Sequence, residues 1–139
     1  MNILIVEDDL LMSIYFEGLI EKLGYTVLAN VNDYETALIA IEREQIDLVL
    51  LDIELDGVPS GLRLAEQFNA KNTPIIIATN HPHETYYEQI KQIPNCLFLA
   101  KPVNIHTLDS AIKLLTQYKQ KPSQFLKEGL RGAIIPIKD

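Results

Sequence analysis

The sequence predicts an α/β fold with a doubly wound, five-stranded parallel sheet, in the order 2-1-3-4-5, and helices on both faces. Apolar runs of strand length alternate five times with longer segments of helical pattern, which is typical of parallel sheets with right-handed crossovers. The runs are almost continuously apolar, as expected for strands buried on both faces. Several end on acidic or other polar residues, at the edge where open parallel sheets place their functional side chains.

Composition narrows the class of protein. The chain has 139 residues, enough for one domain with its own core, and a formal net charge of −7. This charge argues against direct contact with nucleic acid phosphates. The apolar runs are far shorter than the ~20 residues that cross a bilayer, and no secretory signal follows Met1. The lone Cys96 lies in an apolar run, as a reduced, buried thiol would. We therefore expect a cytoplasmic protein without a membrane partner.

Two strand–helix units open the chain. The first strand is expected over residues 3–6, and a helix with one apolar stripe follows over residues 10–23. Gly24 is expected to end this helix, because glycine readily adopts the left-handed conformation after a helix. The second strand is expected over residues 25–29. Asn32, with a glutamate three positions later, has the spacing of a capping box and is expected to cap a helix ending near residue 44.

The third and fourth strands flank a loop and a helix. The third run, residues 48–51, ends on Asp52 and leads into a loop. Ser60 is expected to cap the next helix, which ends near residue 69. The fourth strand is expected over residues 75–78, after a proline whose missing N–H is tolerated at a strand start.

One more helix, strand and helix complete the predicted domain. They are expected over residues 82–93, over residues 96–100, and after Asn104 as the cap of the last helix. The domain is expected to span residues 1–120. Residues 121–139 are too apolar for a solvated linker, so we expect them to dock on this domain or to bind a partner, with a frayed terminus as the alternative.

Polar side chains stand at the ends of four of these strands. They are Glu7 and Asp8 after the first strand, Asp52 after the third, Thr79 after the fourth and Lys101 after the fifth. The predicted strand order brings them to one edge of the sheet. Three carboxylates beside one ammonium repel one another unless a cation neutralises them. Mg²⁺, which prefers oxygen ligands and keeps several waters, fits this set best.

Such a site suits phosphoryl transfer to a carboxylate. Asp52 could act as the nucleophile and form an aspartyl-phosphate. Phosphoryl transfer needs neutralisation of charge more than acid–base chemistry, and Mg²⁺ and Lys101 would supply it. The Thr79 hydroxyl could donate a hydrogen bond to a phosphoryl oxygen. The chain has no glycine-rich phosphate loop that would indicate nucleotide chemistry instead.

The combined motifs resemble the receiver domain of bacterial two-component response regulators, which has a flavodoxin-like fold. The resemblance covers residues 1 to about 120 and rests on four short motifs, Ile5-Val6-Glu7-Asp8, Leu51-Asp52, Ala78-Thr79 and Lys101-Pro102. It implies that Asp52 accepts a phosphoryl group from a sensor histidine kinase or a phosphotransfer protein. It implies no enzymatic output beyond the protein's own phosphorylation and dephosphorylation. The bond before Pro102 is expected to be cis.

The resemblance also assigns roles to individual residues. The Mg²⁺ ligands would be Glu7, Asp8, Asp52 and the backbone carbonyl of Glu54. Thr79 would follow the phosphoryl group, and Phe98 holds the position of the family's rotating aromatic residue, although Phe98 also fits as ordinary core. A downstream protein or a second copy of the chain would bind the fourth helix, fifth strand and fifth helix, or the tail. Tyr86, Tyr87 and Ile90 fit either the core or such a partner face.

The chain departs from the family pattern near Asp52. Asp56-Gly57 stands where many members have a proline, and Asn80 follows Thr79 where many have a smaller residue. Asn80 and Glu54 lie where they would influence attack by water, so we expect an altered lifetime of the aspartyl-phosphate. Two other functions remain as alternatives: a protein-interaction module that works without phosphate, and a small Mg²⁺-dependent phosphohydrolase, which would lack a cap region for its substrate.

Overall fold

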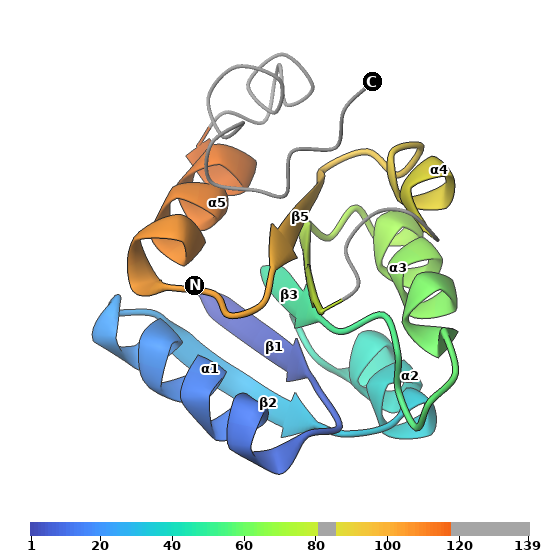
Figure 1. Ribbon diagram of the computed structural model, residues 1–139, viewed down its shortest axis with the longest axis horizontal. Helices are drawn as coiled ribbons and strands as arrows, with labels where there is room; N and C mark the ends of the chain where they lie inside the picture. The colour runs from blue at the N-terminus through green and yellow to red at the C-terminus, as the bar shows by residue number, and fades with distance from the viewer. Residues whose placement is uncertain (81–85, 118–139) are drawn as a thin grey trace.

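The computed structural model describes residues 1–80 and 86–117, which alternate between strands and helices (Figure 1). The elements are β1 (Asn2–Val6), α1 (Leu10–Lys22), β2 (Thr26–Val31), α2 (Tyr34–Arg43), β3 (Leu48–Leu51), α3 (Ser60–Ala70), β4 (Ile75–Thr79), α4 (Tyr87–Ile90), β5 (Cys96–Ala100) and α5 (Ile105–Gln117). Every strand that the sequence predicts is confirmed, with ends that differ by at most two residues.

The strands form one parallel sheet in the order β2-β1-β3-β4-β5, as predicted. Helices α1 and α5 cover one face, and α2, α3 and α4 cover the other (Figure 1). Because successive side chains of a strand point to opposite faces, each central strand contributes to two cores. In β1, Ile3 and Ile5 pack with α1 and α5, whereas Leu4 and Val6 pack with α2 and α3. Burial on both faces explains why the strands are continuously apolar.

Several predicted details of the helices are confirmed. Gly24 follows the last residues of α1 with a φ of 88°, the left-handed conformation that favours glycine. The side chain of Asn104 caps α5, because its Oδ1 accepts the N–H of Thr107 at 2.9 Å.

Cys96 is buried, and burial raises the pKa of its thiol to about 12. Among the described residues, no helix combines the length and the apolar character that a bilayer span requires.

Two predicted helix caps are wrong. The cap of α2 is Asp33, whose Oδ1 accepts the Thr36 N–H at 2.7 Å, and not Asn32. The reason is that β2 continues to Val31, two residues beyond its predicted end. The helix therefore begins one residue later than the capping-box spacing predicts, and Asp33 takes the cap position. Ser60 is the first residue of α3 and makes no side-chain cap. A loop carbonyl takes over part of this role, because Ile53 accepts the Gly61 N–H at 2.7 Å.

The fourth helix is shorter at its end than predicted. It was expected over 82–93, but α4 ends at Ile90, and the Ile93 N–H makes an i to i+3 turn to the Ile90 carbonyl. Pro94 follows and cannot continue the helical ladder. Ile90 is 4% exposed and belongs to the core. The expected start of this helix, over 82–85, and the tail 121–139 lie outside the described residues, as does the side chain of Tyr87.

Candidate functional site

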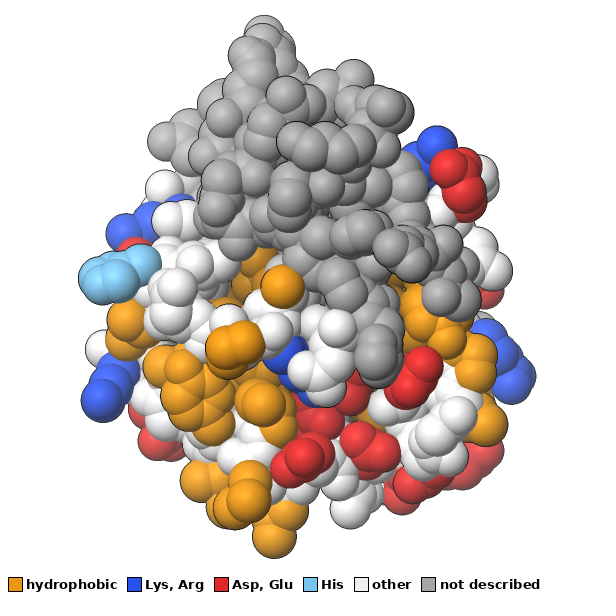
Figure 2. Space-filling model, in the orientation of Figure 1, with side chains coloured by type: hydrophobic (Ala, Val, Ile, Leu, Met, Phe, Trp, Pro, Cys, Tyr) orange, Lys and Arg blue, Asp and Glu red, His pale blue; other side chains and the backbone are white. Residues whose placement is uncertain are grey.

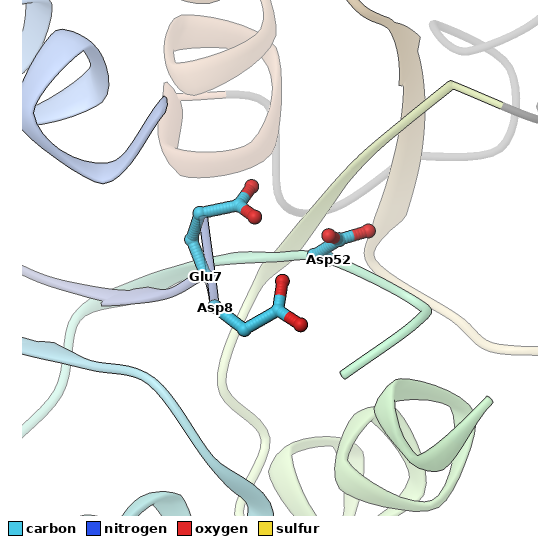
Figure 3. Close-up of side chains that lie close together, drawn as sticks. All are labelled: Glu7, Asp8 and Asp52. Carbon is cyan, nitrogen blue, oxygen red and sulfur yellow. The ribbon is translucent and has the colours of Figure 1, made fainter. Parts of the chain in front are cut away.

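Three carboxylates meet at the carboxyl edge of the sheet. Glu7 and Asp8 follow β1, and Asp52 follows β3; one oxygen from each lies within 4.8 Å of the others (Figure 3). Glu7 is 2% exposed and Asp52 9%, whereas Asp8 is open to solvent. The site therefore has a buried floor and one accessible side.

Lys101 lies against the buried carboxylates. Its Nζ is 2.8 Å from Glu7 Oε1 and 3.3 Å from Asp52 Oδ2, and its side chain is 5% exposed. The bond between Lys101 and Pro102 is cis, as predicted. The Tyr15 hydroxyl donates to the carbonyl of Val103 at 2.7 Å, which ties α1 to the segment after β5. The one cation at this edge, among the described residues, is thus directed to the phosphoacceptor candidate and to its acidic neighbour.

Burial dominates the electrostatics of this site. It raises the pKa of Glu7 to about 7, and the charge of Asp52 adds to the rise, although the hydrogen bond from Lys101 opposes it. Burial alone would lower the pKa of Lys101. The hydrogen bond to Glu7 and the charges of Asp52 and Glu7 outweigh burial and raise that pKa, so Lys101 stays charged at neutral pH. The cluster carries more negative charge than a single lysine balances.

Sheet register explains why residues far apart in sequence meet here. Val6 pairs with Leu51, which puts Glu7 beside Asp52. Thr79 pairs with Ala100, which puts Lys101 at the same edge. Backbone bonds continue just past the strands, from the Asp52 N–H to the Val6 carbonyl at 3.0 Å and from the Lys101 N–H to the Thr79 carbonyl at 2.9 Å. These side chains are consequently placed by rigid strands rather than by long loops.

The loop after Asp52 has a tight turn at the Asp56-Gly57 departure from the family pattern. Both residues have positive φ, 56° and 77°, the conformation of a two-residue hairpin turn. Leu55 and Val58 exchange backbone hydrogen bonds across it. The Asp56 N–H donates to Asp8 Oδ2 at 2.8 Å, so the turn also holds one carboxylate of the cluster. Proline has a φ near −65° and no N–H, so it could not replace Asp56 here.

Three other residues were predicted to belong to the site, namely Thr79, Glu54 and Phe98. Thr79 ends β4 at the same edge and is 3% exposed. The Glu54 N–H donates to Asp52 Oδ1 over a long 3.4 Å. Phe98 is 3% exposed and packs in the core between the sheet and α2, α3 and α4, so its switch role stays a prediction.

Sequence reasoning missed one contact in this region. The Tyr86 hydroxyl donates to Glu54 Oε2 at 3.2 Å, across 32 positions of sequence. Tyr86 is half-buried against the same core as Phe98. The only sequence signal was the place of an aromatic residue near the start of the fourth helix, which fits a core residue equally well.

The donor set fits a hard divalent cation. Oxygens on opposite sides of a Mg²⁺ ion are ~4.2 Å apart, because each Mg–O bond is ~2.1 Å. The three carboxylate oxygens already lie within 4.8 Å of one another. Neighbouring oxygens around the ion are only ~3 Å apart, so the carboxylates would move together by up to ~2 Å to share it. The open side at Asp8 leaves room for water ligands.

Comparison with known proteins agrees with this geometry. Residues 3–113 match the profile of the response regulator receiver domain. The polar-differentiation response regulator DivK of Brucella anthropi is 31% identical over 116 residues, which are 81% of this chain and 93% of DivK. The positive alginate biosynthesis regulatory protein of Pseudomonas aeruginosa is 32% identical over 115 residues, 81% of this chain but 46% of that protein. The chain thus spans about half the length of some curated relatives that it matches.

A solved structure has a similar fold. It is the signal receiver domain of a modulated diguanylate cyclase from Desulfovibrio desulfuricans G20. The TM-score is 0.76 at 31% sequence identity, and the match covers 86% of this chain and 95% of that domain.

Proposed function

The chain belongs to the response regulator receiver domain family, and from this premise we propose that it is a phosphorylation-controlled signalling switch with Asp52 as its phosphoacceptor. The observation that supports this most directly is the placement of Asp52. Its carboxylate lies beside those of Glu7 and Asp8 and 3.3 Å from the ammonium of Lys101, which also contacts Glu7. A nucleophilic carboxylate, charge-neutralising groups and an open side are what phosphoryl transfer to a side chain requires.

The residues have distinct parts in this transfer. An Asp52 carboxylate oxygen attacks phosphorus, forming a P–O bond as the bond from phosphorus to the donor breaks, and the donor leaves with that electron pair. The Lys101 ammonium, now 3.3 Å from Asp52 Oδ2, neutralises a phosphoryl oxygen. The Thr79 hydroxyl donates to another phosphoryl oxygen. Mg²⁺ would be held by Glu7, Asp8, Asp52 and the backbone carbonyl of Glu54, and would supply further positive charge.

A protein phosphodonor has an apolar surface to dock on beside this site. Leu10, Leu11 and Ile14 on the first turns of α1 are 71%, 79% and 53% exposed. Figure 2 shows apolar side chains gathered over α1, next to a group of acidic side chains. We assign this surface to a sensor histidine kinase or a phosphotransfer protein in the cytoplasm, because a donor must bring its phosphoryl group over Asp52.

Phosphorylation would then change the surface formed by α4, β5 and α5. Thr79 and Phe98 lie on the neighbouring strands β4 and β5. A shift of Thr79 toward the phosphoryl group would therefore change the packing around Phe98. A downstream protein or a second copy of the chain would read that change there or through residues 121–139. The net charge of −7 disfavours nucleic acid as the partner.

Intact mass spectrometry tests the proposal. The protein is incubated with Mg²⁺ and acetyl phosphate, alongside Asp52→Asn and the control Asp33→Asn, which retains a helix-capping side chain. We expect one phosphoryl adduct on the wild type and on Asp33→Asn, none on Asp52→Asn, and none when EDTA removes the metal. A folded wild-type protein that acquires no adduct would refute the switch and favour the phosphate-independent module.

A further inference from the structure

A tyrosine and a glutamate bridge two segments beside the phosphoacceptor. The Tyr86 hydroxyl, just before α4, donates to Glu54 Oε2 at 3.2 Å. Glu54 is the second residue after Asp52, and both partners are half-buried. The hydrogen bond therefore joins the loop that carries Asp52 to the start of α4.

Both partners are anchored by other contacts. The Glu54 N–H donates to Asp52 Oδ1, so its backbone faces the phosphoacceptor. The Tyr86 ring packs on the core, and its carbonyl accepts the N–H groups of Gln89 and Ile90 at the start of α4. Partial burial and the nearby Glu54 carboxylate raise the pKa of the Tyr86 phenol, which therefore keeps its proton and donates.

A carboxylate at Glu54 has chemical consequences for an aspartyl-phosphate. Released from Tyr86, its oxygens would become free to accept a hydrogen bond from water near the phosphoryl group. Water activated in this way attacks phosphorus more readily. With Oε2 bound to the phenol, the Glu54 carboxylate is held toward Tyr86 at the start of α4. One of its two oxygens already accepts a hydrogen bond there.

We propose that Tyr86 is a positioning residue that holds the Glu54 carboxylate away from attacking water and so prolongs the life of the phosphoryl group on Asp52. The inference rests on the proposed function and deepens it. In the hydrolysis that Tyr86 restrains, the water oxygen forms a bond to phosphorus as the bond between phosphorus and the Asp52 oxygen breaks. Asp52 leaves as a carboxylate, inorganic phosphate is released, and the water proton passes to Glu54 and then to solvent.

A double-mutant cycle on the full chain tests this assignment. Wild type, Tyr86→Phe, Glu54→Ala and the double variant are phosphorylated with acetyl phosphate and Mg²⁺ and then freed of the donor. The decay of the adduct is followed by intact mass. Glu54→Ala keeps the backbone carbonyl proposed as a metal ligand. Tyr34→Phe is the matched control, because Tyr34 is also half-buried against the same core but lies on α2.

We expect Tyr86→Phe to shorten the adduct's half-life about tenfold or more, as loss of one hydrogen bond to a charged group would. Tyr34→Phe should leave the half-life unchanged. In the Glu54→Ala background, adding Tyr86→Phe should change nothing, because no carboxylate remains to be positioned. Thermal unfolding of each variant shows whether the fold is retained.

The outcomes separate this inference from the function on which it rests. An adduct that decays equally fast in wild type and Tyr86→Phe would overturn the role of Tyr86 while leaving the switch intact. A faster decay that persists in the Glu54→Ala background would show that Tyr86 acts through packing and would also overturn it. If no variant acquires an adduct, the proposed function itself fails.

Discussion

Replacing Gly61 by alanine tests how closely α3 must approach the loop that carries Asp52. Gly61 is buried at the start of α3, and its N–H donates to the Ile53 carbonyl at 2.7 Å. A Cβ at this position would collide with the backbone carbonyl oxygen of Asp52 and would lie 2.6 Å from both Cα and O of Ile53. These are backbone atoms, which cannot move aside as the end of a flexible side chain does. The loop or the helix must shift instead.

The expected size of the effect follows from two opposing terms. Alanine has a higher helix propensity than glycine, worth at most about 1 kcal/mol at Gly61, which lies in the first turn of α3. Overpacking against rigid atoms costs about 3 kcal/mol, the upper part of the usual range. Gly61→Ala should therefore lower the free energy of unfolding by about 2 kcal/mol. Gly18→Ala, in α1, is the control, because its Cβ would meet nothing within 4 Å, and it should raise the same quantity by about 1 kcal/mol.

Urea denaturation and thermal unfolding measure both variants. A difference of about 3 kcal/mol between them corresponds to about 10 °C in Tm for a chain of this size. Gly61→Ala should also accept phosphate from acetyl phosphate more slowly, because the shift moves the backbone of Asp52. If Gly61→Ala were as stable as Gly18→Ala, the close approach of α3 to the Asp52 loop would be wrong.

Three further predictions concern Lys101, Glu7 and the cap of α2. Lys101→Met leaves two buried carboxylates without their cation, so it should lower the free energy of unfolding by about 3 kcal/mol without metal. The loss should be smaller with Mg²⁺, and equal losses in urea titrations with and without Mg²⁺ would contradict this. Burial raises the pKa of Glu7 from 4.5 to about 7, so its contribution to the stability of the metal-free fold is complete below about pH 4.5 and is lost as the pH rises through 7. Because Mg²⁺ needs the ionised form, its affinity should rise from about pH 6 to about pH 8, and calorimetric titration would show a flat profile if Glu7 were not a ligand. Asp33→Ala should cost about 1 kcal/mol of stability and Asn32→Ala less than about 0.5 kcal/mol; the reverse order in denaturation would restore Asn32 as the cap.

Local pattern was sufficient to predict where the polar residues of the site stand along the chain. The four apolar residues before Asp52 indicate a strand buried on both faces, and the alternation with helices indicates a parallel sheet. The order 2-1-3-4-5 is one of the common orders of doubly wound sheets. Once that order is known, the carboxyl ends of β1, β3 and β5 must meet at one edge. This is why the meeting of Glu7, Asp8, Asp52 and Lys101 was predictable without any coordinates.

Helix ends were less predictable from the sequence, because neighbouring residues compete for them. Asn32 and Asp33 are both good capping residues, and the capping-box spacing favours Asn32. The choice depended on β2, which pairs with β1 through Val31 and keeps the chain extended to that point. Ser60 likewise lost its capping role because α3 begins against the carbonyl of Ile53. In both cases a backbone contact outside the helix outweighed the preference of the capping residue.

The sequence by itself determined the sheet and the set of charged residues at its edge. The reason is that apolar runs of strand length can be read locally, and that doubly wound parallel sheets adopt few strand orders. Only the tertiary structure decided which contacts those residues make. Lys101 lies closer to Glu7 than to Asp52. Gly61 has no side chain, which lets α3 approach the loop after Asp52, and the Tyr86 hydroxyl donates to Glu54. Each of these depends on side-chain conformations and on distances of a few ångströms between segments far apart in sequence, which no local pattern encodes.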